Sequence, residues 1–305
     1  MNISEVLNLW AIGWGFGAAV AVLLLGAAME LGGKESSVAR AARNLVVPAA
    51  VGLGIVVAYA LTAGWSGGKG ERPWWQGEAR QMLIVAAAVS ALLVGIMCQV
   101  RGWAKWVLWV VLGIAMMLVV VRGPWMGMAW EGWAGLAACV PALFLVYGMA
   151  LAGVIRGGTS VERLWLVPLG VMWVTTAAAG VSVMPVFDMA AGQMFVYLAV
   201  MAGLAIVAGI WKRWRASAAW AGVLIAAVYA GAWTSAAFFD RGADWALPQA
   251  ALGLLAAGPV GTAVSWVPGL RRRPWLCVFL AMGLAAMLVA PAVIVAANAA
   301  RSIEG

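Results

Sequence analysis

The chain has 305 residues, of which 66% are hydrophobic and 10% are charged, and its formal net charge is +8. Soluble domains have roughly 45–50% apolar and about 25% charged residues, so this chain has too little polar surface to coat a globule. Together with a mean hydropathy of +1.00, the composition excludes a soluble enzyme, a disordered chain and a secreted disulfide scaffold. We therefore expect an all-α, polytopic transmembrane bundle that forms a single integral membrane domain over residues 1–305.

Apolar runs divided by charged residues or by Gly and Pro predict about ten membrane-spanning helices, because each crossing needs about 20 apolar residues. Pro248 and Pro259 interrupt the ninth run, and the fourth follows the third after only a short turn. In chain order the predicted spans are 8–29, 45–64, 81–100, 104–121, 132–154, 165–184, 193–211, 218–238, 246–266 and 275–297.

The basic residues alternate between the loops that join these spans. Those that follow odd-numbered spans are Lys34, Arg40, Arg43, Arg101, Lys105, Arg156, Arg163, Lys212, Arg213, Arg215, Arg271, Arg272 and Arg273. Fewer lie in the even-numbered loops and the C-terminal tail, namely Lys69, Arg72, Arg80, Arg122, Arg241 and Arg301. Because cytoplasmic loops carry an excess of Lys and Arg, the odd-numbered loops are predicted to be cytoplasmic and both termini to lie outside.

Several kinds of chemistry are excluded by what the sequence lacks. The chain has no histidine, so it offers no His pair for haem and no His-based metal site. The three cysteines are far apart in apolar runs, and we expect them to be buried as small hydrophobic residues. No Gly-rich phosphate-binding motif is present. The basic residues are spread over short loops, which does not indicate a nucleic-acid partner.

Acids, arginines and tryptophans gather on the predicted outer side. A charge at membrane depth is costly, so such residues are functional candidates, although an acid at a helix start is also favoured by the helix dipole. The charged candidates are Glu78, Arg80, Arg122, Glu131, Asp188, Asp240 and Arg241. Most of the 20 tryptophans lie at span ends, as an aromatic belt at the headgroup level requires. The groups Trp74/Trp75 and Trp125/Trp130/Trp133 also lie beside charges, where they would wall a site for a flat ring.

Four segments together resemble a known family in their order and spacing. They are PWWQGEARQMLI, VLGIAMMLVVVRGPWMGMAW, WAGLAACVPALFLVYGMALAG and LVPLGVMWVTTAAAGVSVMPVFDM. Over roughly residues 1–215 the chain resembles the membrane-anchor subunit of dimethyl-sulfoxide-reductase-type molybdoenzymes. The resemblance implies an eight-helix core with both termini outside, to which residues 216–305 would add C-terminal helices, two more than that family has.

The resemblance also implies a quinol site. Glu78 matches the family's acid near that site, Arg122 its arginine after the fourth helix, and Asp188 its acid after the sixth. Where the family often has a histidine linked to quinol oxidation, this chain has Trp65, and an indole cannot act as a base. Glu78 then serves alone as the proton acceptor, or the site is altered. The further quinol-binding candidates are Trp65, Trp74, Trp75, Arg80 and Trp125.

A function follows from the resemblance as an expectation. A menaquinol or ubiquinol would be oxidised near the outer face, and its electrons would pass to an iron–sulfur subunit and then to a molybdopterin subunit on the outer side. The chain itself would hold no haem and no metal, would contact membrane lipid, and would lie in the inner membrane of a prokaryote as part of anaerobic respiration. Two other classes stay open: a ten-helix exporter of drugs or metabolites, and a non-catalytic scaffold whose Trp-rich loops dock a partner.

Overall fold

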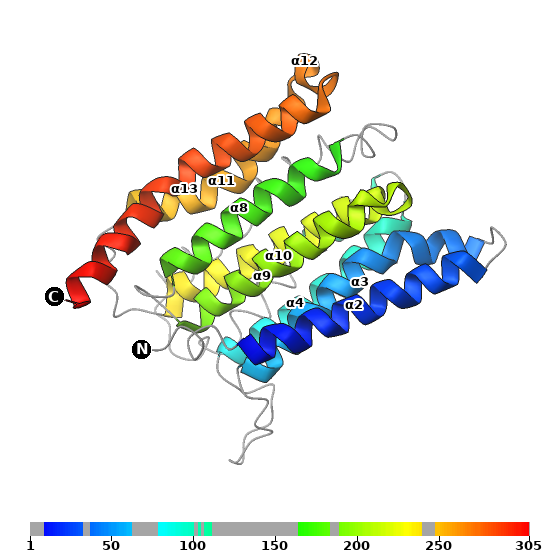
Figure 1. Cartoon of the computed structure of the whole chain (residues 1–305), viewed down its shortest axis with the longest axis horizontal. Helices are drawn as coiled ribbons and strands as arrows, with labels where there is room; N and C mark the ends of the chain where they lie inside the picture. Colours follow the sequence, from blue (N-terminus) through cyan, green and yellow to red (C-terminus); the bar gives the residue numbers. More distant parts are fainter. Residues whose placement is uncertain are drawn as a thin grey trace, which may run out of the picture.

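A computed structural model describes residues 9–32, 37–62, 79–100, 103–104, 107–111, 164–183, 189–239 and 248–304 of the chain (Figure 1). These residues are nearly all helical, and none of them is in a strand. Within the same ranges, 6 helices are long and apolar enough to cross a membrane. Lipid cannot hydrogen-bond to the backbone, so a segment in it must satisfy its own N–H and C=O groups, as a helix does. The prediction of a helical membrane bundle is confirmed.

The long helices coincide with the predicted spans. The run at 132–154 lies outside the described residues, and that at 104–121 is described only at 103–104 and 107–111. The long helices are α2 (Leu9–Gly32), α3 (Ser37–Thr62), α4 (Ala79–Gln99), α8 (Leu166–Val183), α9 (Met189–Ile210), α10 (Arg215–Phe239), α11 (Pro248–Ala263) and α13 (Pro274–Glu304). Short helical turns connect some of them: η2 (Lys212–Trp214), η3 (Val264–Trp266) and α12 (Pro268–Arg271).

Two central helices, α9 and α10, separate two groups of helices. On one side α2 packs against α3 and α3 against α4, and on the other side α8, α11 and α13 pack together (Figure 1). Close contacts show that neighbours in the chain are antiparallel, since Gly15 of α2 faces Ala58 of α3 while Gly26 faces Val46. We call the end of the bundle where α2 begins and α13 ends the terminal end. The turn end is the opposite end, where η2 joins α9 to α10.

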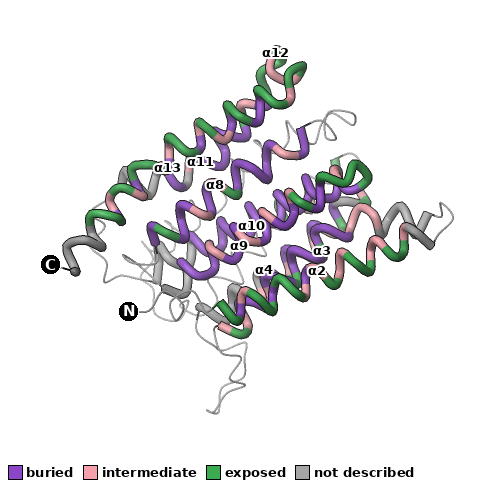
Figure 2. Tube along the Cα trace, viewed as in Figure 1, coloured by how far each residue is buried: buried purple, intermediate pink, exposed green. Residues whose placement is uncertain are grey.

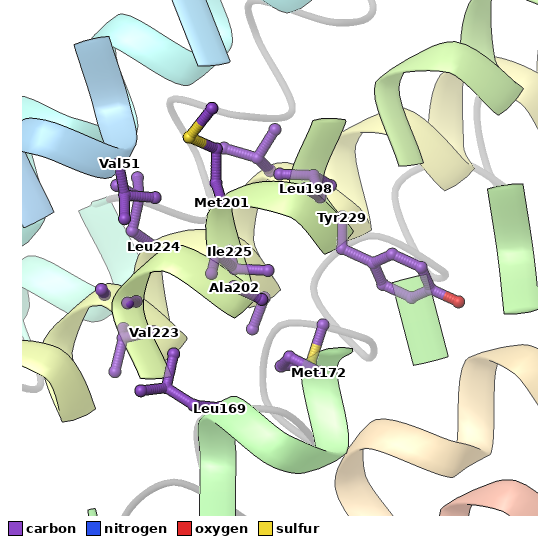
Figure 3. Packing of buried hydrophobic residues seen from close by; sticks show 14 of the residues in the cluster. Val51, Leu169, Met172, Leu198, Met201, Ala202, Val223, Leu224, Ile225 and Tyr229 are labelled. Atoms are coloured by element: carbon purple, nitrogen blue, oxygen red, sulfur yellow. The ribbon is translucent and has the colours of Figure 1, made fainter. Parts of the chain in front are cut away.

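Burial differs sharply between the central and the peripheral helices (Figure 2). In the apolar span of α10, 94% of the residues are buried inside the bundle, against 11% in that of α2. Figure 3 shows the core around α10, where Leu224 lies beside Val51 of α3 and Ile225 lies beside Met201 and Ala202 of α9. The outward faces of α2 and α13 remain apolar because lipid is as apolar as a protein core.

Small residues set the closest helix contacts. A Cβ atom added to Gly15 would come within 2.5 Å of the Gly54 carbonyl oxygen and 2.6 Å of the Ala58 Cβ. A Cβ at Gly253 of α11 would likewise collide with the Leu288 carbonyl of α13. Such contacts supply the dispersion energy that holds helices together where no hydrophobic effect drives their association.

Two helix boundaries differ from the apolar pattern. α3 begins at Ser37, upstream of the predicted start at 45, so Arg40 and Arg43 belong to the helix rather than to a loop. Pro248 does not interrupt the ninth span but begins α11, where its missing N–H costs nothing because the first N–H groups of a helix have no partner within it. Pro259 lies inside the same helix.

Candidate functional site

A cluster of buried aromatic and hydroxyl side chains lies toward the terminal end of the bundle. It joins the last turn of α3 to the first half of α9 and the second half of α10. Its members, which we call the tyrosine cluster, are Tyr59, Thr62, Phe195, Tyr197, Tyr229 and Trp233. The five rings are each no more than 4% exposed. The cluster therefore brings together residues separated by well over a hundred positions in the sequence.

Hydroxyl groups in the cluster form a directed hydrogen-bond chain. Thr62 Oγ1 donates to the Ala58 carbonyl oxygen at 2.9 Å and also contacts the Tyr197 hydroxyl. A threonine hydroxyl has one proton, so Tyr197 is the donor in the second bond. The Tyr229 hydroxyl donates to the Leu254 carbonyl oxygen at 3.0 Å, which ties α10 to α11. The hydroxyl oxygens of Tyr197 and Thr62 retain lone pairs with which they can accept further hydrogen bonds.

The rings of the cluster form two sets of aromatic contacts, one of Phe195, Tyr229 and Trp233 and one of Tyr59 and Tyr197. Phe195 lies 5.1 Å from Tyr229 and 5.6 Å from Trp233, measured between ring centroids. Tyr59 and Tyr197 meet edge to face at 6.4 Å. Aromatic pairs at such separations attract beyond the area that they bury. The Trp233 Nε1 is buried, and no hydrogen-bond partner for it occurs in the described part of the chain.

Most of the site residues predicted from sequence lie outside the described residues. These are Trp65, Trp74, Trp75, Glu78, Arg122, Trp125 and Asp188. Arg80 belongs to the first turn of α4, and its side chain is not described. What the structure does describe is the helix ends beside several of them: α3 ends at Thr62, α4 begins at Ala79, and α9 begins at Met189. All three helix ends are at the terminal end, the same end as the tyrosine cluster (Figure 1).

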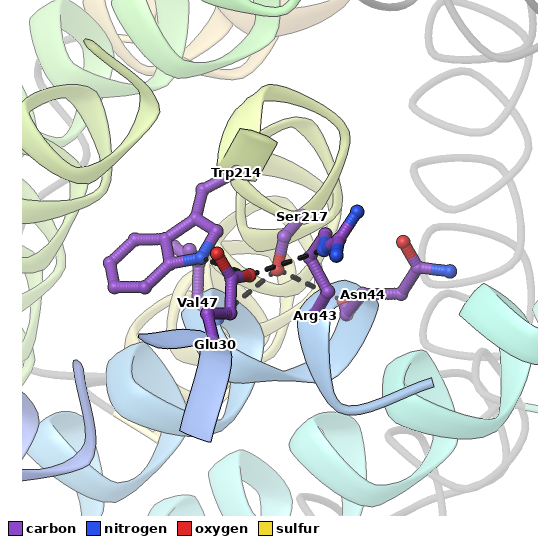
Figure 4. A network of polar contacts seen from close by, with 6 residues as sticks. All are labelled: Glu30, Arg43, Asn44, Val47, Trp214 and Ser217. Carbon is purple, nitrogen blue, oxygen red and sulfur yellow. Dashed lines mark hydrogen bonds and ion pairs between the residues drawn. The ribbon is translucent and has the colours of Figure 1, made fainter. Parts of the chain in front are cut away.

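A second polar cluster lies at the turn end of the bundle, and it is charged (Figure 4). Glu30 of α2 accepts a hydrogen bond from Trp214 Nε1 at 2.9 Å and forms an ion pair with Arg43 Nε of α3 at 3.2 Å, both through Oε1. The side chain of Glu30 is 6% exposed and that of Arg43 is 25% exposed. The other carboxylate oxygen, Oε2, is buried without a hydrogen-bond partner among the described residues.

Neutral groups beside this ion pair repair a gap in α3. Pro48 lies inside α3 and has no N–H, so the Asn44 carbonyl loses its usual partner four residues on. Ser217 of α10 donates to that carbonyl oxygen at 3.0 Å and accepts from the Val47 N–H at 3.1 Å. We call Glu30, Arg43, Asn44, Val47, Trp214 and Ser217 the carboxylate cluster.

Sequence reasoning missed both clusters, although each left a signal. The chain has only 4 tyrosines, and three of them belong to the tyrosine cluster. All three lie inside predicted apolar spans, whereas the candidate tryptophans lie in the loops. Trp214 follows the end of the predicted span 193–211, a position where an aromatic belt is expected, but it is 4% exposed and donates to Glu30. Trp211 and Trp275, at 40% and 68% exposed, do fit a belt.

Metal ligands do not gather in the described ranges, where no three His, Cys, Asp or Glu side chains come together. The absence of a metal and of haem from this chain stays a prediction. Cys277 is free and buried, as expected of a cysteine that packs as a small hydrophobic residue.

Compared with protein families, with curated proteins and with solved structures, the chain matches none of them.

Proposed function

We propose that the chain is the membrane-anchor subunit of a molybdopterin oxidoreductase, in which it binds and oxidises a menaquinol or ubiquinol near the outer membrane face. Its electrons would pass to an iron–sulfur subunit and from there to the molybdopterin subunit. The observation that carries the proposal is the tyrosine cluster, which lies at the same end of the bundle as the helix ends next to Trp65, Glu78 and Asp188. The remaining steps rest on the chemistry of those residues.

The tyrosine cluster suits the floor of a quinol site. A quinol head is a flat ring with two hydroxyl groups, so it needs aromatic walls and hydrogen-bond acceptors. Phe195 and Trp233, which are 0% and 4% exposed, would back such a ring from inside the bundle, and the oxygens of Tyr197 and Thr62 can accept a quinol O–H. The buried Trp233 N–H is a donor without a partner among the described residues and is suited to a quinone carbonyl.

The neighbouring loop residues have separate roles in quinol oxidation, because the reaction needs both a proton acceptor and a group that stabilises negative charge. Oxidation of a quinol releases two electrons and two protons, and neutral tyrosines cannot hold the protons at ordinary pH. We therefore keep Glu78 as the proton acceptor and Arg122 as the group that stabilises developing negative charge on a quinol oxygen. Trp65, Trp74, Trp75, Arg80, Trp125 and Asp188 would complete the pocket.

The proposal includes a topology. About ten helices would cross the inner membrane of a prokaryote, both termini would lie outside, and the terminal end would face outward. The basic turn Lys212–Trp214 between α9 and α10 supports this orientation, because basic loops stay in the cytoplasm.

A matched pair of threonine variants tests the proposal. Thr62 and Thr262 each donate to the carbonyl four residues earlier, at 2.9 and 2.7 Å, but only Thr62 also contacts Tyr197. Thr62→Val should lower quinol oxidation by the assembled complex about three- to ten-fold, the equivalent of one hydrogen bond. Thr262→Val should leave it unchanged. Membrane vesicles supplied with a reduced quinone analogue and an artificial acceptor provide the assay.

Purification of the protein for this assay also tests whether the proposed partner subunits are bound to it. The chain purified from its own membranes should bring with it molybdenum and iron that belong to other subunits. Recovery without either metal, or equal activity in the two threonine variants, would contradict the proposal.

A further inference from the structure

The turn between α9 and α10 has the sequence WKRWR over residues 211–215, and it is held in one conformation. Within it the Trp211 N–H donates to the Ala208 carbonyl oxygen at 3.2 Å, and the Trp214 N–H donates to the Trp211 carbonyl oxygen at 2.8 Å. The two indole rings also contact each other, with centroids 4.8 Å apart.

A side-chain bond fixes this turn to the rest of the bundle. Trp214 Nε1 donates to Glu30 of α2, and Glu30 is in turn paired with Arg43 of α3. The turn is thus attached to two helices far away in the sequence. Its basic side chains therefore extend from a turn that is bonded to the rest of the bundle.

The charges at this turn are not neutralised within the described structure. Lys212 and Arg213 are exposed, and Arg215 is partly buried. Among the side chains that the structure describes, Glu30 is the only carboxylate, and it is buried against Arg43 and Trp214. The turn therefore presents three cations with no described acid left to pair with them.

Arg215 adds an observation that points to a ligand. Its Nε is buried, and the described residues offer it no hydrogen-bond partner. A guanidinium N–H is a strong donor, and leaving it unpaired in a buried position is costly. An oxygen acceptor that carries negative charge would satisfy it.

We propose that this turn binds the phosphate group of an anionic phospholipid in the membrane leaflet at the turn end. Lys212, Arg213 and Arg215 would surround the phosphate, and Trp211, which is 40% exposed, would lie at the headgroup level beside it. The acyl chains would run along the apolar surface of the bundle. This site is separate from the quinol site at the other end, so neither proposal depends on the other.

A charge-matched pair of variants separates a built site from general attraction to a basic surface. Arg272 and Arg273, also exposed, lie at another connection of the same end, between α12 and α13. The comparison is therefore Lys212→Gln/Arg213→Gln against Arg272→Gln/Arg273→Gln. Because all four side chains are exposed, neither pair of substitutions should disturb folding.

The measurement is a titration of the purified full-length protein with phosphatidylglycerol, followed by native mass spectrometry. Each cation near an anionic lipid contributes about five-fold in affinity. The Lys212/Arg213 double variant should therefore bind phosphatidylglycerol more than about ten-fold more weakly, and the Arg272/Arg273 variant should differ from wild type by less than about three-fold. Phosphatidylcholine should bind the wild type weakly, and inorganic phosphate should not compete.

Trp214→Phe tests whether the bond between the turn and Glu30 matters for lipid binding, since it removes the donor without changing the charge. Weaker binding of phosphatidylglycerol by this variant is the expected result. Equal losses in the two charge-matched variants would overturn the proposal in favour of a general surface potential. Competition by inorganic phosphate at equal concentration would show a free-anion site and would also overturn it.

Discussion

The two ends of the bundle satisfy their buried polar groups with different kinds of partners. At the terminal end, the tyrosine cluster is neutral, and the hydroxyls of Thr62, Tyr197 and Tyr229 bond to each other or to backbone carbonyls. At the turn end, the carboxylate cluster joins an ion pair, an indole N–H and a serine that repairs the backbone at Pro48. A neutral, aromatic cluster can accept a lipophilic ring, whereas an ion pair holds helices together and the cations of the neighbouring turn attract anions.

The first prediction concerns orientation, and its effect is all-or-none. A reporter fused at Ser302 should be located outside, and one inserted between Lys212 and Arg215 should be located in the cytoplasm, because the basic turns mark the cytoplasmic side. Alkaline phosphatase and a fluorescent protein, active on opposite sides, provide the measurement. Both termini in the cytoplasm would instead favour the exporter class.

The second prediction breaks the ion pair at the turn end. Arg43→Gln leaves Glu30 buried with the Trp214 N–H as its one described donor, and we expect a loss of about 2–3 kcal/mol in the free energy of unfolding. A fully buried pair costs about 3–5 kcal/mol when one partner is removed, and here Arg43 is 25% exposed. Thermal or denaturant unfolding in detergent micelles measures the loss.

The control for this prediction is the double variant Glu30→Gln/Arg43→Gln. It removes both charges and keeps an amide oxygen for the Trp214 N–H, so it should be more stable than Arg43→Gln alone. If the double variant is the less stable of the two, the pair does not act as an ion pair.

The third prediction concerns the repair of α3. Ser217→Ala leaves the Asn44 carbonyl without a donor and should cost about 1–2 kcal/mol of unfolding free energy. In a Pro48→Ala background, residue 48 gains an N–H that can reach that carbonyl, so the same substitution should cost less. Unfolding of the four proteins of this cycle in one detergent measures the difference, and strict additivity would argue against the repair.

The fourth prediction, which has the smallest effect, concerns the tyrosine cluster. Tyr197→Phe removes the hydroxyl that donates to Thr62 and keeps the ring against Tyr59, so it should cost about 1 kcal/mol of unfolding free energy. The effect on quinol oxidation should match that of Thr62→Val, since both remove the same bond. Differential scanning fluorimetry and the vesicle assay report the two quantities, and full activity in Tyr197→Phe would separate the cluster from the quinol site.

Apolar run lengths predicted the spans well because bilayer thickness sets the helix length. The run at 218–238, for example, corresponds to α10 at Arg215–Phe239. The start of α3 was predicted too late because a helix that carries Arg43 into the interface resembles a loop in hydropathy alone. Only tertiary contact with Glu30 shows why that arginine belongs in the helix.

The tyrosine cluster and the carboxylate cluster are harder to predict, because they too depend on tertiary contacts that local sequence does not show. Tyr59 of α3 meets Tyr197 of α9, and Tyr229 of α10 meets Phe195 of α9, but nothing in their local sequences indicates these contacts. Charged loop residues such as Glu78 and Arg122 are conspicuous in an apolar sequence, so they are predicted as candidates. Neutral hydroxyls within spans are not, because a hydropathy pattern treats them as part of the helix core.

Photolabelling with an azidoquinone tests the central claim, that a quinol binds at the terminal end, most directly. The probe should label peptides that contain the end of α3 or the start of α9, near Thr62 and Tyr197, and an excess of unlabelled quinone should abolish the label. Labelling concentrated near the turn Lys212–Trp214, or labelling that excess quinone does not reduce, would contradict the account.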